Sequence, residues 1–508
     1  MKDQKAKGIL LSYLNTAFNM CFNLLVVPML ISALSDAQYG IYKVKQCFAG
    51  PLMMLNLGMS TIVVRAISGY RELQTEQAKL EKESTLFLAS MISVVMAVVV
   101  FLLGMAMTGI LPYFFAKTYN QEELDLAKKL LSIFTCTTAL HILSDTFRGS
   151  ALGNERFVFY YGTTTVQYVL RLIAIVALIQ WTDLNAIMVA MVDLVLYAGI
   201  AIANICYSAF RLKERIHMHF FRREELVNIA MFSAAVLLQA IVTQVNNNVD
   251  NIILGAMIID KKVITMYSSA LSIFSIYNVL LSVFSNVYLP KAARLVTKGA
   301  SVDELMDLVI HPGRIQAVIA VAIVCAFGLF GGNFIKIWIG EQHLAAWPVT
   351  LMLMIPVTIP LVQNMCVAIL NAKLKQTFRS IVLFVMAIIN VVLSVILVKY
   401  IGFWGAALGT AISILIGHVI AMNIYYHKVI GLRIFKMFRE IFRGILPAGL
   451  ITTAVCLPLA IFVMDTMVGF LIKCLVFVCI YLILLWTIGL QPKEKERIAE
   501  MCRGFLRR

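Results

Sequence analysis

The sequence lacks the signatures of most enzyme classes. It contains no G-x-x-x-x-G-K-[ST] loop for nucleotide phosphates, no H-E-x-x-H zinc motif and no G-x-S-x-G nucleophile motif. Its 10 cysteines form no C-x-x-C pair and have no Cys/His spacing suited to zinc. We therefore expect no enzymatic activity, no catalytic residue, no metal site and no cofactor.

Charged residues are scarce and unevenly divided. They make up 14% of the chain, with 43 Lys and Arg against 27 Asp and Glu, for a net charge of +16. The segments between the long apolar stretches, which are predicted below to span a membrane, are short. None of those on the outer side of that membrane is large enough for a glycosyl-transfer site. A membrane glycosyltransferase or polymerase therefore remains only as a weaker alternative.

Apolar residues make up 61% of the sequence, and the mean hydropathy is +0.88. Long apolar stretches fill almost the whole chain, and in lipid each must be helical because its backbone polar groups need internal partners. The predicted fold class is an all-α integral membrane protein with about 14 transmembrane helices. The first two spans are long, and we expect them to be tilted or broken, at Pro28 and Pro51 respectively. The predicted spans are 8–34, 40–67, 84–111, 127–150, 157–181, 186–210, 229–259, 265–290, 312–337, 348–371, 379–400, 405–427, 444–464 and 468–490.

Basic residues cluster in alternate loops. They crowd the segments 2–7, 211–223 and 428–443 and the tail after Gln491. Because short Lys/Arg-rich loops stay in the cytoplasm, both termini are predicted to be cytoplasmic. The positive charge then reflects topology and contact with anionic membrane lipids, and we expect no nucleic-acid partner.

A weak internal repeat suggests two halves. The segment 151–157 (ALGNERF) joins the fourth and fifth spans as 369–375 (ILNAKLK) joins the tenth and eleventh. A repeat of six spans keeps its orientation, which is typical of parallel repeats in transporters. We predict an N-lobe at 1–228 with helices 1–6 and a C-lobe at 229–442 with helices 7–12. Residues 443–508 would add helices 13–14 and a basic cytoplasmic tail.

The first helix of each half carries a polar stripe at helical spacing. Polar groups within spans usually face a protein interior or a water-filled cavity. The stripes either join helices by hydrogen bonds or line a hydrophilic cavity, and we favour the cavity because both halves have one. The residues are Asn15, Asn19 and Asn23 in the first stripe, and Gln239, Thr243, Asn246 and Asp250 in the second, which Asn247 widens.

Charged residues in the N-terminal half are the other site candidates. His141, Asp145 and Arg148 share one helix face. Asp145 and Arg148 either pair with each other, or Arg148 faces the lumen while Asp145 or His141 takes up a proton. Arg171 either pairs with Asp193 across a helical hairpin or faces the lumen.

The balance of charge in the spans is positive. Arg65 either reaches the lipid headgroups or belongs with the lumen cations. The six basic candidates are Arg65, Arg148, Arg171, Lys43, Lys45 and Lys473, against the three acidic residues Asp145, Asp193 and Asp250. A net positive interior favours an anionic cargo such as a diphosphate, because Lys and Arg form charge-assisted hydrogen bonds with its oxygens.

Several short motifs occur in order along the chain. The segment 34–42 (LSDAQYGIY) has the pattern L-x-x-x-x-Y-G-x-Y, and 55–59 (LNLGM) contains a D/N-L-G element. The segment 387–394 (AIINVVLS), followed by 402–410 (GFWGAALGT), has the pattern N…G-x-x-G-A-A-x-x-T. These segments resemble the Wzx-type polysaccharide and O-antigen flippases of the multidrug/oligosaccharidyl-lipid/polysaccharide (MOP) exporter superfamily. The resemblance covers essentially the whole chain.

The resemblance implies two pseudo-symmetric six-helix lobes, MATE-like, plus a C-terminal helix pair in a bacterial plasma (inner) membrane. It implies a flippase that moves an undecaprenyl-diphosphate-linked oligosaccharide to the outer leaflet for O-antigen, capsule or exopolysaccharide synthesis. The cargo would cross by alternating access through a cationic central cavity, and polysaccharide polymerase and glycosyltransferases are potential partners. Arg65, Arg148 and Arg171 are then the cationic candidates. The alternative within the superfamily is a MATE-type cation-coupled drug antiporter.

Overall fold

The secondary structure is helical. The computed structural model describes residues 2–496 except 74, 116–118, 220–226, 228–236, 238–248, 259, 298–299, 374–376, 462–465 and 493, and no strand occurs among those described. Ten of their helices are long and apolar enough to cross a membrane, and two bent helix pairs raise the number to 12. Of the two other predicted spans, 40–67 is a broken helix and 229–259 lies mostly outside the described residues. The all-α membrane fold class is confirmed.

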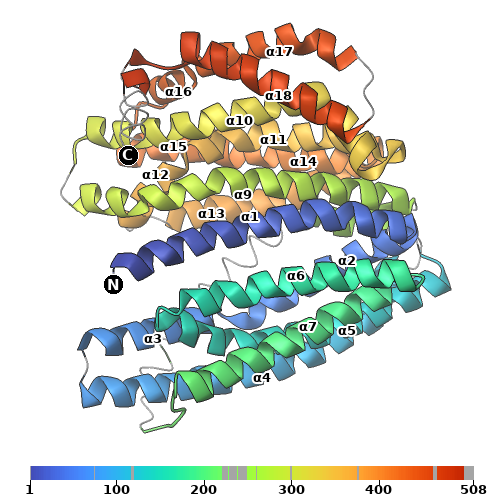
Figure 1. Cartoon of the computed structure of the whole chain (residues 1–508), viewed down its shortest axis with the longest axis vertical. Coiled ribbons are helices and arrows are strands. Elements are labelled where there is room, and N and C mark those ends of the chain that lie inside the picture. Colours follow the sequence, from blue (N-terminus) through green and yellow to red (C-terminus); the bar gives the residue numbers. More distant parts are fainter. Residues whose placement is uncertain are drawn as a thin grey trace. The chain divides into compact units, whose positions relative to one another are not determined.

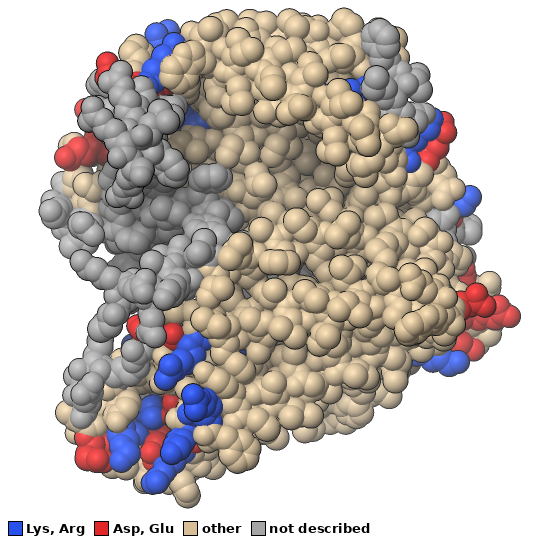
Figure 2. Space-filling model, in the orientation of Figure 1, with Lys and Arg blue, Asp and Glu red and all other residues tan. Residues whose placement is uncertain are grey.

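Charge is distributed as a membrane protein requires. On the face shown in Figure 2, acidic and basic side chains gather near the helix ends, and the broad region between them is free of charge among the residues coloured there. Lipid-facing positions are large apolar side chains, such as Val98 and Leu102, which are 54% and 61% exposed. These residues have no polar group that lipid would leave without a partner.

The predicted helix breaks are only partly correct. Helix α1 (Lys2–Ala33) continues through Pro28, so no break occurs there. Helix α2 (Asp36–Met53) also contains Pro51, and the second span breaks just after it, at the 3₁₀ turn η1 (Met54–Asn56). Leu57 and Gly58 then adopt φ values of 55° and 68°. Glycine tolerates this left-handed conformation, so the chain can turn there before α3 (Met59–Leu73) begins.

The chain divides into an N-terminal unit, Met1–Ser268, and a C-terminal unit, Ser269–Arg508. The helices of the N-terminal unit run side by side in Figure 1. Within this unit α5 is the central helix and contacts α2, α3, α4, α6 and α7. The bounds of the helices that follow α3 are α4 (Glu76–Phe115), α5 (Gln121–Gly153), α6 (Phe157–Trp181), α7 (Ala186–Cys206) and the π-helical turn η2 (Tyr207–Arg211).

Local sequence explains the position of α5. Asn120 and Glu123 form a capping box at its start, which satisfies free backbone N–H groups of the first turn. Near its end, Gly149 and Gly153 allow α3 to approach closely. A Cβ at Gly149 would lie 2.7 Å from the backbone oxygen of Ser60, and one at Gly153 would lie 2.9 Å from Ile67. Helices α3 and α5 therefore lie with their backbones in close contact at these two glycines.

The C-terminal unit is built around α10, which contacts α11, α12, α16, α17 and α18. A second capping box, formed by Ser301 and Glu304, starts α10. The helix bounds are α9 (Lys261–Thr297, whose first turns belong to the N-terminal unit), α10 (Val302–Ile339), η3 (Glu341–His343), α11 (Ala346–Val362), α12 (Asn364–Ala372), α13 (Thr377–Ile401), α14 (Trp404–Ile414), η4 (Leu415–Ala421), α15 (Met422–Tyr425), η5 (Tyr426–Ile430), α16 (Ile434–Phe442), α17 (Ile445–Ile461), α18 (Met467–Leu484) and η6 (Leu485–Gly489).

The glycine and asparagine motif of 387–410 packs α13 against α14. A Cβ at Gly405 would overlap the backbone of Leu397. Buried Asn390 accepts hydrogen bonds from Ser394 (3.0 Å) and Thr410 (3.1 Å). Small residues let the two backbones approach, and the polar group joins them within the membrane.

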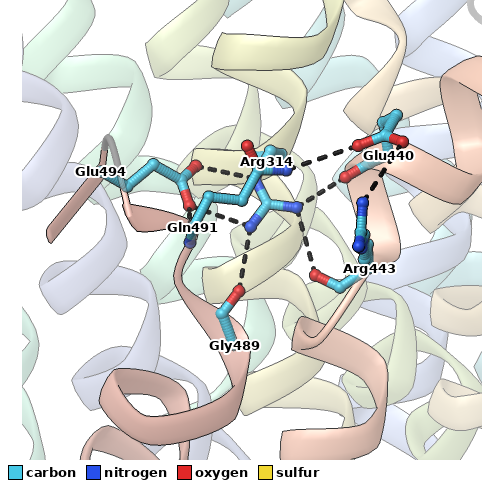
Figure 3. Close-up of polar contacts among 6 residues, drawn as sticks. All are labelled: Arg314, Glu440, Arg443, Gly489, Gln491 and Glu494. Carbon is cyan, nitrogen blue, oxygen red and sulfur yellow. Dashed lines mark hydrogen bonds and ion pairs between the residues drawn. The ribbon is translucent and has the colours of Figure 1, made fainter.

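A buried arginine joins the last helices of the C-terminal unit to α10 (Figure 3). The side chain of Arg314 is 2% exposed and forms an ion pair with Glu494, with Nε 2.7 Å from Oε1. A second bond to that carboxylate, from Nη2 to Oε2, measures 2.9 Å. The guanidinium also donates to three backbone oxygens, those of Glu440 (2.6 Å), Arg443 (3.1 Å) and Gly489 (2.9 Å).

These bonds use the full capacity of the side chain, because a guanidinium has five N–H donors. The acceptors lie at the ends of α16 and η6 and in the segment after η6. One side chain therefore satisfies helix-end carbonyls that would otherwise lack partners, and it connects the appended helix pair to α10.

Candidate functional site

A half-open cavity with a mixed polar and apolar lining lies in the N-terminal unit, between α2, α5, α6 and α7. Its volume is about 170 Å³. Helix α5 contributes one wall through four residues spread over two turns of one helix face. Helices α6 and α7 contribute the polar and aromatic groups opposite. The lining residues are Met53, Phe134, Thr137, Thr138, His141, Gln167, Tyr168, Arg171, Asp193 and Tyr197.

Arg171 and Asp193 form an ion pair at one side of this cavity. Nε of Arg171 lies 2.6 Å from Oδ1 of Asp193, and Nη2 lies 3.1 Å from Oδ2. Tyr42 completes the group: it accepts a hydrogen bond from Arg171 (2.9 Å) and donates one to Asp193 (3.3 Å). The charge of Arg171 is thus neutralised within the protein, in agreement with the first of the two predicted arrangements.

Arg148 lies in different surroundings from Arg171. Its Nη2 donates to Thr164 (3.0 Å), and its guanidinium lies over the ring of Tyr160, 4.2 Å from the centroid. Asp145 does not pair with it and instead accepts a hydrogen bond from Asn56 (2.8 Å). Within the described part of the chain, the partners of Arg148 are thus a hydroxyl group and an aromatic ring, and none is a carboxylate. It is therefore a half-buried positive charge in a membrane helix, able to receive an anion.

His141 lies two turns before Arg148 on α5 and faces the cavity. Its ring packs edge-on against Tyr197, with centroids 5.6 Å apart. His141, Asp145 and Arg148 thus follow one face of α5, and each has its own side-chain partner from another element.

The stripe of α1 contacts α6. Asn15 donates to the backbone oxygen of Tyr161 (3.2 Å) and to Thr165 (3.0 Å), and Asn19 donates to the Tyr168 hydroxyl. Both asparagines are half-buried. They therefore join two helices of the N-terminal unit, and Asn19 also orients a tyrosine that lines the cavity.

The remaining candidates are dispersed. Arg65 is exposed on α3. Asp250 is buried and accepts a hydrogen bond from Tyr267 (2.7 Å). The side chain of Asn23 and the residues Gln239, Asn246 and Asn247, with Thr243, lie outside the described residues.

Several cavity residues were not predicted from the sequence. Gln167, Tyr168 and Tyr197 are single polar residues within apolar spans, and only their spacing from Arg171 and Asp193 could have indicated them. Asn56, the partner of Asp145, stands in the 55–59 segment but has no side-chain periodicity that predicts this contact.

Comparison with known proteins identifies a family model, described as polysaccharide biosynthesis protein, that matches residues 6–296. The chain is also similar to the uncharacterized membrane protein EpsK of Bacillus subtilis (strain 168). The two are 22% identical over 448 residues, which are 85% of this chain and 84% of EpsK.

Two solved structures share the fold. A lipid II flippase MurJ in an inward closed conformation matches with a TM-score of 0.74 and 17% identity, over 94% of this chain and 98% of that one. An inward-facing multidrug resistance MATE family transporter of the MOP superfamily matches with a TM-score of 0.67 and 14% identity, over 82% of this chain and 95% of that one.

Proposed function

Because the chain belongs to the polysaccharide biosynthesis protein family, we propose that it is a flippase for an undecaprenyl-diphosphate-linked oligosaccharide. It moves this lipid from the cytoplasmic to the outer leaflet of a bacterial plasma membrane by alternating access, and both of its termini are cytoplasmic. The observation that supports the anionic cargo most directly is Arg148, a membrane-embedded cation with no carboxylate partner among the described residues.

The predicted resemblance to Wzx-type flippases of the MOP superfamily is confirmed by the family match and the shared fold. The family match and the fold shared with MurJ and MATE proteins support a transporter rather than an enzyme. The proposal goes further and specifies the cargo and its direction.

The physical argument starts from the barrier that the bilayer presents. A charged, polyhydroxylated headgroup loses its hydration in hydrocarbon, and the free energy of that loss prevents spontaneous exchange between leaflets. A transporter removes the barrier by offering charge-assisted hydrogen bonds to the phosphates. Arg148 can make them, whereas Arg171 is already engaged with Asp193. The polyprenyl chain remains in lipid throughout.

Deletion of the gene in the source bacterium tests the function. We expect loss of surface polysaccharide and accumulation of the lipid-linked oligosaccharide in the cytoplasmic leaflet, both restored by the wild-type gene. Unchanged surface polysaccharide and no accumulation would exclude the proposal. Polymerase and glycosyltransferases acting on the same glycan are the expected functional partners.

Variants of Arg148 test the role of the charge. Arg148→Ala removes a hydrogen bond donor to a charged group, worth about 1.5–3 kcal/mol, so export should fall about ten- to a hundredfold at equal protein abundance. Arg148→Lys should retain part of it. Arg156→Ala, at an exposed arginine eight residues further on, is the matched control and should export normally.

A cation-coupled drug antiporter is the second candidate, favoured by the MATE fold match. His141, Asp145 and Asp250 are the candidates for coupling to an ion gradient in either case. Uptake of an organic cation such as ethidium into inverted membrane vesicles separates the two functions, because the flippase proposal predicts no uptake above that of vesicles without the protein.

A further inference from the structure

The cavity of the N-terminal unit has polar groups without a hydrogen-bond partner among the described residues. Gln167, His141 and Tyr197 line it, and none of the three forms a hydrogen bond to another residue in the described part of the chain. The ring of His141 packs on that of Tyr197. Within a membrane, such groups are costly unless a polar molecule occupies the space they face. The cavity is therefore suited to contents with several hydroxyl groups.

The charge of the cavity argues against an anion. Arg171 and Asp193 are the lining residues with full charges, and they neutralise each other through two short contacts. A phosphate would need an uncompensated cation, which this cavity does not offer. A neutral ligand meets no such requirement.

The aromatic lining favours a ring-shaped ligand. Phe134, Tyr168 and Tyr197 lie among the polar groups. The faces of aromatic rings are electron-rich, and the C–H groups on one face of a sugar ring are weakly positive, so the two stack. The volume of about 170 Å³ is close to that of an engineered cavity of about 150 Å³ that binds benzene, so it admits a group the size of one ring.

The position of the cavity also fits the proposed cargo. His141, at the cavity, and Arg148 are seven residues apart on α5. Seven residues advance a helix by about 10 Å and return to the same face. A diphosphate at Arg148 could thus carry a sugar ring that reaches the cavity.

We infer that this cavity is a binding subsite for one neutral sugar ring of the glycan headgroup, separate from the phosphate contact at Arg148. The inference rests on the proposed function. It assigns Gln167 and Tyr197 as sugar-binding residues through hydrogen bonds, and Tyr168 as a stacking platform held by Asn19.

Binding measurements on the full-length protein in lipid nanodiscs test the inference. The two probes are the lipid-linked oligosaccharide extracted from the source bacterium and undecaprenyl diphosphate without sugar. The wild-type protein should bind the glycosylated lipid more tightly. Gln167→Leu and Tyr197→Phe should each weaken that binding about three- to tenfold, as expected for one lost hydrogen bond, and leave the affinity for the sugar-free lipid unchanged.

Two controls separate sugar binding from folding. Gln180→Leu changes an exposed glutamine on the same helix and should alter neither affinity. Gln167→Leu should not lower the thermal unfolding midpoint, because Gln167 has no hydrogen bond to lose in the part of the chain that the structure describes. Tyr197→Phe keeps the ring that packs on His141 and provides a second test if the first variant folds poorly.

The outcomes distinguish this inference from the function it rests on. Equal wild-type affinity for the two lipids, or equal loss of both affinities in the cavity variants, would overturn the sugar subsite and leave the flippase proposal in place. Binding of neither lipid by the wild-type protein would overturn both.

Discussion

Arg314 should be the most important single side chain for the attachment of α16–α18 to the C-terminal unit. The perturbation is Arg314→Met, which keeps an unbranched apolar stem and removes all five donors. The carboxylate of Glu494 and three helix-end carbonyls then lose their partner.

The expected loss of stability follows from the acceptors that Arg314 leaves without a partner. Breaking a buried ion pair by removing one member destabilises a protein by about 3–5 kcal/mol, because the other member remains without its counter-charge. Arg314→Lys keeps the charge but has three donors in place of five. It should lose about two hydrogen bonds, or about 1–3 kcal/mol at 0.5–1.5 kcal/mol each.

Unfolding of the purified protein by a denaturing detergent, followed by circular dichroism, measures these differences. Arg433→Met is the matched control, since its ion pair with Asp303 is 52% and 75% exposed and should contribute at most about 1 kcal/mol. We expect stability to decrease in the order wild type, Arg433→Met, Arg314→Lys and Arg314→Met. If Arg314→Met unfolds no more easily than Arg433→Met, the reasoning is wrong.

Three further outcomes are expected. Burial raises the pKa of Glu494, but the hydrogen bonds from Arg314 and the backbone of Gln491 outweigh it, so the pKa is lowered. The stability that the ionised carboxylate contributes is complete above its ordinary pKa of 4.5 and is lost as pH falls through the lower pKa of the folded state. Unfolding titrations should therefore show that the stability advantage of wild type over Glu494→Gln shrinks as pH falls below 4.5. Arg171→Ala should destabilise the protein by about 3–5 kcal/mol, because it leaves Asp193 buried without its counter-charge. The double variant Arg171→Met/Asp193→Leu should regain most of that stability in the same detergent titration. No recovery would contradict the ion-pair account. Gly405→Val should reduce the amount of folded protein seen by size-exclusion chromatography, since its side chain would overlap the backbone of Leu397; normal yield would refute the close packing.

The candidate site shows where sequence reasoning succeeded and where it stopped. Spacing along one helix correctly grouped His141, Asp145 and Arg148, because helical periodicity is a local property. It could not assign their partners. Asp145 is bound by Asn56 from the break between α2 and α3, and Arg148 by Thr164 of α6; neither contact has a periodic signal.

The amino-acid sequence by itself determined the membrane class, the helical fold and the family, because these depend on the length and apolarity of each segment and on short motifs within it. Only the tertiary structure decided which buried charges are neutralised and which remain available. Arg148 and Arg171 are alike in sequence as single arginines in apolar helices. Yet Arg171 pairs with Asp193 on α7, whereas Arg148 pairs with no acid in the described part of the chain. The physical reason is that the free energy of a buried charge depends on its neighbours in space, and those come from helices remote along the chain.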